Sequence, residues 1–196
     1  MANKIKYGLK NVHYAEATIS DDGSATYATP VAWPGAVNLA MDAQDEEIVF
    51  NADNTRYYSG FANNGYSGDY ESALIPEDFK DDILGEVSNG NLKIEVTDAP
   101  VKHFALLFQF EGDESATRHV LYNCTASRPA IEGATKEDTI SPSTEKLSIV
   151  ATNIYNSVIG KNMVKARCSD VSSDDYVNWF SAVKQPTTPP VTSSTP

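Results

Sequence analysis

The fold is decided by the stretch His103-Phe104-Ala105-Leu106-Leu107-Phe108-Gln109-Phe110, which is apolar at nearly every position. A strand with one wet face alternates apolar and polar residues, whereas an apolar run of this length without alternation is typical of a strand covered on both sides. The run ends in Glu111-Gly112-Asp113, which are polar and turn-forming residues. We therefore predict a central β-strand that is buried on both faces.

Further strand signals lie on either side of this run. Residues 92–97 alternate apolar and polar side chains, which is the pattern of a strand with one wet face. Residues 12–19 and 26–33 flank the turn Ser20-Asp21-Asp22-Gly23-Ser24, which predicts a hairpin. The chain is therefore expected to be mainly β over about residues 1–170. The other predicted strands span 117–126, 147–152 and 163–168.

Two short helices are predicted to interrupt the strands. The first, at 76–84, begins with proline, has acidic residues in its first turn and is followed by glycine. Its Phe79 and Ile83 share one face, which we expect to dock on the sheet. The second lies within 171–184 and has a serine N-cap followed by two aspartates. Its apolar stripe consists of Tyr176, Trp179, Phe180 and Val183.

Residues 42–70 form the irregular part of the chain. This segment begins with acidic residues, continues through an apolar trio and then sets aromatic residues among glycine and asparagine. Large apolar side chains are costly to leave in water. Two interpretations are open: a long hairpin whose rings fold back on the body, or an arm that buries them against another subunit. The candidate contact residues are Ile48, Val49, Phe50, Arg56, Tyr57, Tyr58, Phe61 and Tyr66.

The composition excludes several classes of function. The chain has 196 residues, which suits one domain, and its 27 acidic and 15 basic residues give a net charge of −12. Such a surface repels polyanions, so we expect no specific binding of DNA or RNA. We find neither the apolar run of a signal peptide nor a membrane span, and we expect folding in the cytosol without a membrane partner. Residues 185–196 are almost entirely Pro, Thr and Ser, which predicts a disordered, linker-like tail.

Side chains that could carry chemistry do not gather at ligand or catalytic spacing. His13, His103 and His119 lie in or beside separate strand segments, without a neighbouring histidine, cysteine or carboxylate pair. Cys124 and Cys168 are far apart, and two free, partly buried thiols are favoured over a disulfide. The acidic clusters lack the register of a calcium loop, and no nucleophile elbow or phosphate loop is present. We predict no catalytic residue, metal or cofactor, and a protein that is not an enzyme.

A series of motifs in fixed order covers residues 4–152. They are Lys4-Ile5-Lys6-Tyr7-Gly8-Leu9-Lys10-Asn11-Val12-His13-Tyr14-Ala15, Pro34-Gly35-Ala36-Val37-Asn38-Leu39, Ala62-Asn63-Asn64-Gly65-Tyr66-Ser67-Gly68, Ala73-Leu74-Ile75-Pro76-Glu77-Asp78-Phe79, His119-Val120-Leu121-Tyr122-Asn123-Cys124-Thr125-Ala126-Ser127-Arg128-Pro129 and Thr135-Lys136-Glu137. None is a catalytic signature, so their specificity lies in number and order. In these motifs the chain resembles the major tail (tail-tube) proteins of long, non-contractile-tailed bacteriophages, the siphophages of Gram-positive hosts. The resemblance does not extend to the Pro/Thr tail.

The resemblance implies a structural protein of the virion tail, made in the host cytoplasm. The family's fold is a β-sandwich-like body with a flanking helix, and six copies close into a ring whose inner strands form a continuous β-barrel. Rings stack into a tube, and the strand–loop–strand before the helix reaches the next ring; here this maps onto the arm at 42–70 and the helix at 76–84. Expected partners are further copies of the chain, the tape-measure protein, and tail-terminator and distal tail proteins, while DNA passes through the lumen without specific binding.

Two consequences can be weighed against alternatives. An acidic lumen wall lets DNA slide without sticking, and Asp69 and Glu71, beside the arm, are the candidate lumen-lining carboxylates.

The main alternative is a carbohydrate-binding or adhesin-like β-sandwich, because Pro/Thr/Ser linkers join such modules and exposed Tyr and Trp stack on sugars. It predicts a monomer whose aromatic residues line one open face. An enzyme, the third possibility, predicts a deep pocket with converging polar groups.

Overall fold

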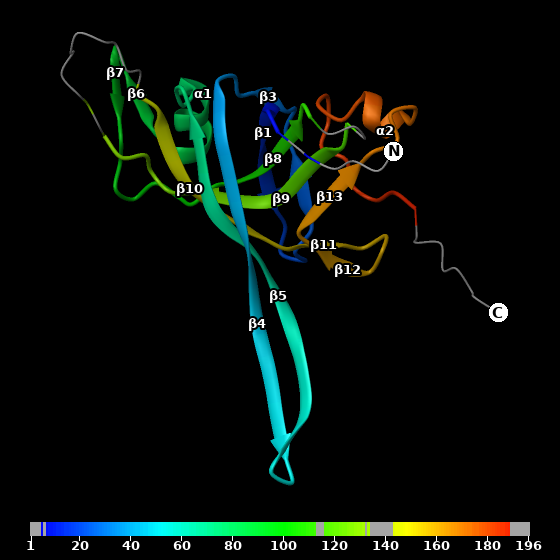
Figure 1. Cartoon of the computed structure of the whole chain (residues 1–196). Coiled ribbons are helices and arrows are strands. Elements are labelled where there is room, and N and C mark those ends of the chain that lie inside the picture. The colour runs from blue at the N-terminus through cyan, green and yellow to red at the C-terminus, as the bar shows by residue number, and fades with distance from the viewer. Residues whose placement is uncertain (1–4, 6, 113–115, 132, 134–142, 189–196) are drawn as a thin grey trace.

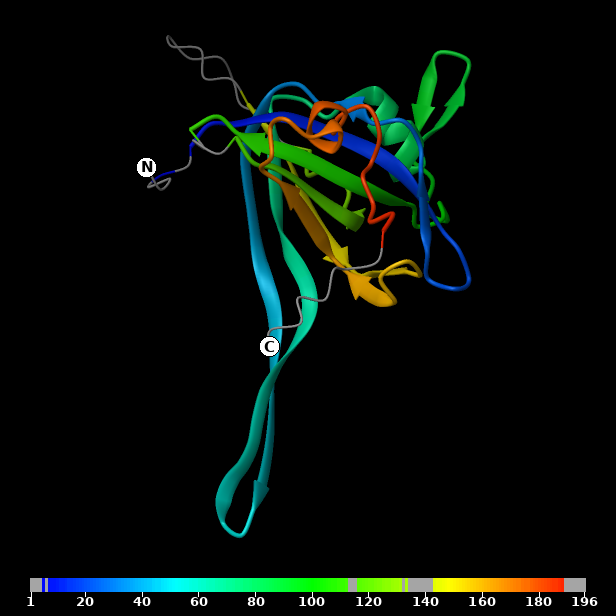
Figure 2. The same cartoon turned by 90° about the vertical axis from the view of Figure 1, so that its right-hand side faces the viewer.

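The computed structural model describes residues 5, 7–112, 116–131, 133 and 143–188. It is 54% strand and 7% helix, so the prediction of a mainly β fold is confirmed. Figure 1 shows a body from which a long two-stranded ribbon projects, and Figure 2 shows the same projection from the side. The principal strands are β1 (Leu9–Ile19), β4 (Ala36–Ala52), β5 (Thr55–Ser72), β8 (His103–Phe110), β9 (Arg118–Ala126) and β10 (Glu145–Thr152).

One antiparallel sheet of nine strands runs through the body in the order β2-β1-β8-β9-β10-β5-β4, with β13 paired to β9 and β3 paired to β1. Two small two-stranded sheets, β6-β7 and β11-β12, complete the strands. The minor strands are β2 (Ala25–Tyr27), β3 (Val31–Ala32), β6 (Val87–Asn89), β7 (Leu92–Ile94), β11 (Ile154–Asn156), β12 (Lys161–Met163) and β13 (Lys165–Cys168).

The central strand β8 is covered on both faces, as its sequence predicts. Successive side chains of a strand point to opposite faces, and here Leu106 packs in one cluster of buried residues while Leu107 packs in another. Both side chains are 0% exposed. Alternation is absent from the sequence of β8 because both of its faces pack on clusters of buried residues over most of the strand.

The first cluster lies between two walls of the same sheet. Tyr14 of β1 and Phe104 of β8 form one wall, and Tyr70 of β5 and Leu147 of β10 form the other, so one continuous sheet builds a sandwich-like body. Phe79 fills the space between them at 0% exposure and packs edge-to-face on Tyr14, with ring centroids 5.0 Å apart. Burial of so many rings makes this cluster the main source of stability.

Phe79 comes from the first predicted helix, whose position is confirmed. The helix α1 (Glu77–Phe79) continues as a single π-helical turn, η1 (Lys80–Leu84). Gly85 ends it with a φ of 75°, a left-handed conformation that glycine adopts without steric cost. Ile83 is buried beside Phe79, as their four-residue spacing predicts.

The second cluster is covered by the C-terminal segment, where the prediction of a helix over much of 171–184 is too long. The helix α2 (Asp174–Val177) has four residues, and its cap is the predicted Ser173, whose Oγ accepts from the Tyr176 backbone N–H. The chain then turns so that the buried Trp179 indole donates to the backbone oxygen of His119 at 3.3 Å. Burial of the Trp179 indole with a hydrogen-bond partner stabilises the chain more than one further turn of α2 would.

The tail predicted at 185–196 begins with residues that contact the body. The Gln185 side-chain amide donates to the Ala25 backbone oxygen at 2.9 Å, and the Pro186 oxygen accepts from the Asn156 side chain at 3.5 Å. Composition alone does not show these contacts, because both depend on which loops lie nearby. Residues 189–196 of the predicted tail lie outside the described residues.

Two predicted strands are shorter than their patterns indicate. Residues 26–33 divide into β2 and β3, separated by Pro30, which cannot donate to a ladder. The alternating run 92–97 contributes only β7, which pairs with β6 alone among the described strands. Leu92 is 66% exposed, so the apolar face of this pattern is not covered by the body.

Candidate assembly surfaces

The segment at 42–70 is a hairpin arm. Strand β10 pairs with β5 only from Ser72 to Tyr66, and beyond Tyr66 the described strand β5 has β4 as its sole partner. Residues 44–65 therefore leave the sheet as a two-stranded ribbon, which Figures 1 and 2 show projecting from the body. Nine residues of β4 at about 3.3 Å each give the ribbon a reach of roughly 30 Å.

The tip of the arm is a tight turn of two residues. Asp53 and Asn54 have φ values of 50° and 61°, and the flanking Ala52 and Thr55 are paired, which is the geometry of a type I′ hairpin turn. Asp and Asn tolerate this left-handed conformation better than other residues with a side chain. The Thr55 hydroxyl donates to the Ala52 oxygen at 3.0 Å and tightens the turn.

Apolar side chains cover both faces of the ribbon. Ile48 and Phe50 share a face with Tyr58, which lies directly opposite Phe50. Val49 lies on the other face, together with Phe61. Isolated two-stranded ribbons are marginally stable in water, and these exposed side chains bury little apolar area within the ribbon itself.

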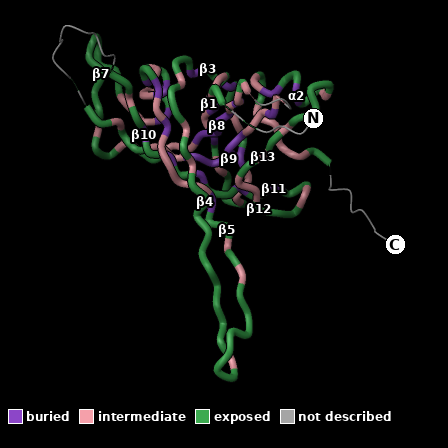
Figure 3. The backbone as a smooth tube through the Cα atoms, viewed as in Figure 1, coloured by how far each residue is buried: buried purple, intermediate pink, exposed green. Residues whose placement is uncertain are grey.

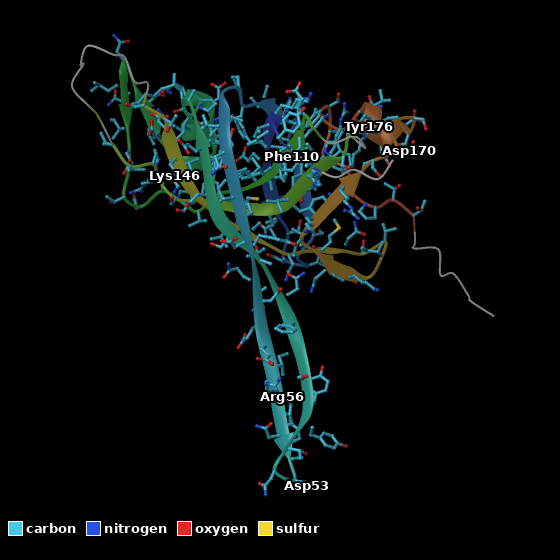
Figure 4. The ribbon with its side chains drawn as sticks, viewed as in Figure 1. Asp53, Arg56, Phe110, Lys146, Asp170 and Tyr176 are labelled. Carbon is cyan, nitrogen blue, oxygen red and sulfur yellow. The ribbon has the colours of Figure 1, made fainter. Side chains whose placement is uncertain are left out.

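The arm side chains meet solvent, not the body. Phe61 is 75% exposed and Tyr57 is 74% exposed, and Figure 3 shows the ribbon as almost continuously exposed. The interpretation in which these rings fold back on the body is therefore wrong for the ribbon. Arg56 forms an ion pair with Glu47 at 2.9 Å, and Figure 4 places it near the tip with Asp53.

Two aromatic residues of the predicted segment belong to the root of the arm. Tyr66 is half-buried, and the Lys165 ammonium lies 4.4 Å from its ring centroid. Tyr70 is 1% exposed and belongs to the core. Of the predicted contact residues, Tyr66 is thus the one that the body partly covers, while Ile48, Val49, Phe50, Arg56, Tyr57, Tyr58 and Phe61 are exposed on the ribbon.

A glycine lies at the point where the ribbon leaves the sheet. Gly65 has a φ of 95°, and its N–H donates to the Asn63 side-chain oxygen at 2.9 Å. A Cβ atom at Gly65 would overlap the backbone oxygen of Ala151 on β10. Only glycine fits both requirements, so this residue sets the direction in which the arm departs.

The predicted lumen carboxylates lie on the sheet face opposite to the core. Asp69 and Glu71 alternate with the buried Tyr70, so they point to the same outer face. The Lys146 ammonium lies 2.8 Å from the Asp69 carboxylate, and the Ser148 hydroxyl donates to the same carboxylate at 2.8 Å. These hydrogen bonds, the one from Lys146 above all, lower the pKa of Asp69.

Lys146 is the residue that sequence reasoning missed on this face. It lies directly opposite Glu71 in the register of β10 and β5, and Figure 4 marks its place on β10. It offsets one of the two negative charges of Asp69 and Glu71. Strand alternation places Lys146 and Ser148 on one face of β10, but nothing local in the sequence predicts which strand pairs with β10.

The described residues contain no group of three histidine, cysteine or acidic side chains that could hold a metal ion. His103 Nδ1 lies 2.7 Å from the Asn123 side-chain oxygen, and His13 stacks on Phe180 with centroids 4.7 Å apart. Cys124 is a free, fully buried thiol, and burial raises its pKa. A thiol in this environment stays protonated and unreactive at neutral pH.

In the part of the chain that the structure describes, no helix has the length and apolar content to cross a membrane.

No protein-family model matches this sequence, and no curated protein matches it.

Proposed function

We propose that this chain is a structural subunit that assembles with copies of itself into the tail tube of a long, non-contractile-tailed bacteriophage. In this proposal six copies close into a ring, rings stack, and the tube conducts DNA into the host. The observation that carries the proposal is the arm, an isolated ribbon with exposed apolar side chains on both faces. Such a surface on a strongly charged protein is typical of a contact site for another protein chain.

The edges of the sheet support assembly as well. Strand β4 has 17 residues and pairs only with β5 among the described strands, so its other edge carries unpaired backbone groups. Long exposed edges are templates for pairing with another chain. Closure into a ring pairs such edges between neighbouring copies and leaves none exposed.

The charge supports a passive role toward DNA. With a net charge of −12, a wall built from copies of this chain attracts few phosphates and releases few counterions. Asp69 and Glu71 remain the proposed lumen-lining pair, although Lys146 reduces their combined charge. The tape-measure protein inside the tube and the terminator and distal proteins at its ends are the further partners in this proposal.

Electron microscopy of the purified protein over a range of concentrations tests the proposal. Rings with six-fold symmetry or tubes are the expected result, with sedimentation showing species well above 21.3 kDa. A protein that stays monomeric at every concentration, and whose exposed tyrosines bind a glycan, would instead favour the carbohydrate-binding alternative.

A second measurement concerns the arm. The double variant Tyr57→Ala/Tyr58→Ala removes two exposed rings from the ribbon and should impair stacking of rings without preventing folding. The matched variant Tyr70→Ala removes a buried ring and should lower the melting temperature. Normal tubes from the double variant would show that the arm does not join rings.

A further inference from the structure

A groove opens at the root of the arm, on the same sheet face as the first cluster. Phe108 and His119 form its floor with parallel rings whose centroids are 5.2 Å apart, and Tyr66 of the arm root forms one wall. Its volume is about 220 Å³. A cavity of about 150 Å³ accommodates benzene, so this groove has room for one aromatic side chain but is smaller than the ~300–1,000 Å³ of typical ligand sites.

The rim of the groove is basic, in a protein with a large excess of acidic residues. Lys165 lines the groove, and Arg167, two residues further along β13, shares its face. Both side chains are exposed, and neither forms an ion pair within the part of the chain that the structure describes. Two cations without an ion-pair partner among the described residues, beside an aromatic floor, match an occupant that is aromatic and acidic.

One face of the arm has this chemistry. Phe61, the most exposed ring of the ribbon, lies directly opposite Glu47, and Asp45 lies on the same face two residues away. Asp45 makes no ion pair within the described chain, whereas Glu47 is paired with Arg56. The face thus presents one aromatic side chain flanked by carboxylates, the complement of the groove.

The arm and the groove of one molecule cannot meet. The ribbon is continuous with the sheet and extends away from the body, and Figure 4 shows Phe110, which lines the groove, far from Arg56 and Asp53 at the tip. A contact between the two surfaces therefore joins two copies through different patches. Heterologous contacts of this kind generate rings or open-ended stacks.

The size of the arm supports a second copy as the occupant. Taking about 200 Å² for each aromatic side chain, the exposed apolar groups of the ribbon present roughly 600 Å². These groups lie on both faces of the ribbon, so the groove takes only the Phe61 face. If the other face packs on a neighbouring surface, and the partner buries an equal area, the arm contact as a whole reaches about 1,200 Å², the lower limit of stable protein interfaces.

We propose that the groove is the receptor for the arm of a second copy, with Phe61 inserted above Phe108 and His119 and with Asp45 facing Lys165 and Arg167. This inference rests on the proposed self-assembly and adds to it the surface that receives the arm. Buried aromatic anchors with charged residues at the rim are the usual arrangement at the energetic centre of an interface.

A charge swap with matched controls tests the receptor. Lys165→Glu should raise the concentration needed for assembly roughly tenfold or more, and Asp45→Lys should do the same. The combination of Lys165→Glu with Asp45→Lys should restore most of the loss. The matched controls are Glu46→Lys, on the opposite face of the ribbon, and Lys161→Glu, outside the groove; both change the charge equally and should have little effect.

Cross-linking gives an independent measurement. In a Cys168→Ser background, Asn63→Cys on the Phe61 face of the ribbon combined with Met41→Cys in the groove should form disulfides between copies in the assembled protein, because both changes leave Phe61 and Lys165 in place. Ala62→Cys, on the opposite face, combined with Met41→Cys should not. Cys124 does not interfere because it is fully buried.

The outcomes separate the two proposals. If the unaltered protein never assembles, both the proposed function and the receptor are wrong. If it assembles but Lys165→Glu and Lys161→Glu behave alike, and the disulfides do not form, assembly stands and the receptor lies elsewhere.

Discussion

Two phenylalanines with opposite environments allow a quantitative test of the division between arm and core. Phe79 is 0% exposed and contacts the rings of Tyr14, Trp33 and Phe104. Burial of about 200 Å² at ~25 cal/mol per Å² corresponds to about 5 kcal/mol, and measured Phe→Ala changes in cores cost about 3–5 kcal/mol. For a chain of this length, Phe79→Ala should lower the melting temperature by about 10 °C.

Phe61→Ala is the matched change on the arm. Phe61 is 75% exposed, so only about 50 Å² is buried on folding, and the free energy at stake is about 1 kcal/mol at most. That loss falls on a ribbon whose local opening does not disrupt the body. The melting temperature should therefore change by less than about 2 °C, while assembly measured by sedimentation should be impaired.

Thermal melting followed by circular dichroism, with sedimentation of the same samples, measures both effects. The reasoning fails if Phe61→Ala melts as early as Phe79→Ala, because the arm ring would then be part of the core. It also fails if Phe79→Ala melts normally, because the first cluster would then contribute little to stability.

Three other predictions concern the arm root and the outer sheet face. Gly65→Ala should cost at least about 1–3 kcal/mol, from its φ of 95° and from overlap of the new Cβ with the Ala151 backbone oxygen, and should redirect the arm, which X-ray scattering would detect as a changed molecular shape. Lys146→Met should raise the pKa of Asp69 toward 3.8, measurable by NMR titration. Because the pKa of Asp69 is lower in the folded protein, the stabilisation by Asp69 is present above about pH 4 and is lost as the pH falls through that lowered pKa. If the pKa of Asp69 is unchanged in Lys146→Met, the pairing of Asp69 with Lys146 is contradicted. Asp69→Lys/Glu71→Lys should slow DNA ejection from assembled particles, and ejection at the normal rate would refute a luminal role for this face.

Local patterns predict those parts of the fold that depend on one segment. The non-alternating run of β8 predicts its double burial, and the proline, Phe79–Ile83 spacing and glycine predict the first helix. In each case the deciding physics, burial of a periodic apolar face or the geometry of a cap, lies within a few residues. The aromatic residues at 42–70 leave two interpretations open, and most of their rings are exposed on an arm and not folded back on the body.

Features that depend on pairing between distant segments escape sequence reasoning. Lys146 reaches Asp69 only through the register of β10 and β5, and Lys165 enters the groove only because β13 pairs with β9. The exposed Leu92 shows the same limit: the alternation around it predicts a strand with one buried face, but does not show whether any other segment lies against that face. The second helix is shortened because burial of Trp179 determines the local path.

Salt should separate the electrostatic and apolar parts of the arm–groove contact. Charges interact over a Debye length of about 10 Å at 0.1 M salt and about 3 Å at 1 M, whereas burial of an aromatic ring is not weakened by salt. The assembly defect of Lys165→Glu should therefore shrink as NaCl rises from 0.1 to 1 M, because the repulsion of Asp45 by the new carboxylate is screened. The defect of Phe61→Ala should persist over the same range. Concentration series in the sedimentation assay at both salt levels measure the two defects, with Lys161→Glu and Glu46→Lys as controls. Equal salt dependence of the two defects would mean that Lys165 acts through packing on Tyr66 and not through its charge, and the acidic face of the arm would then have no role in recognising the groove.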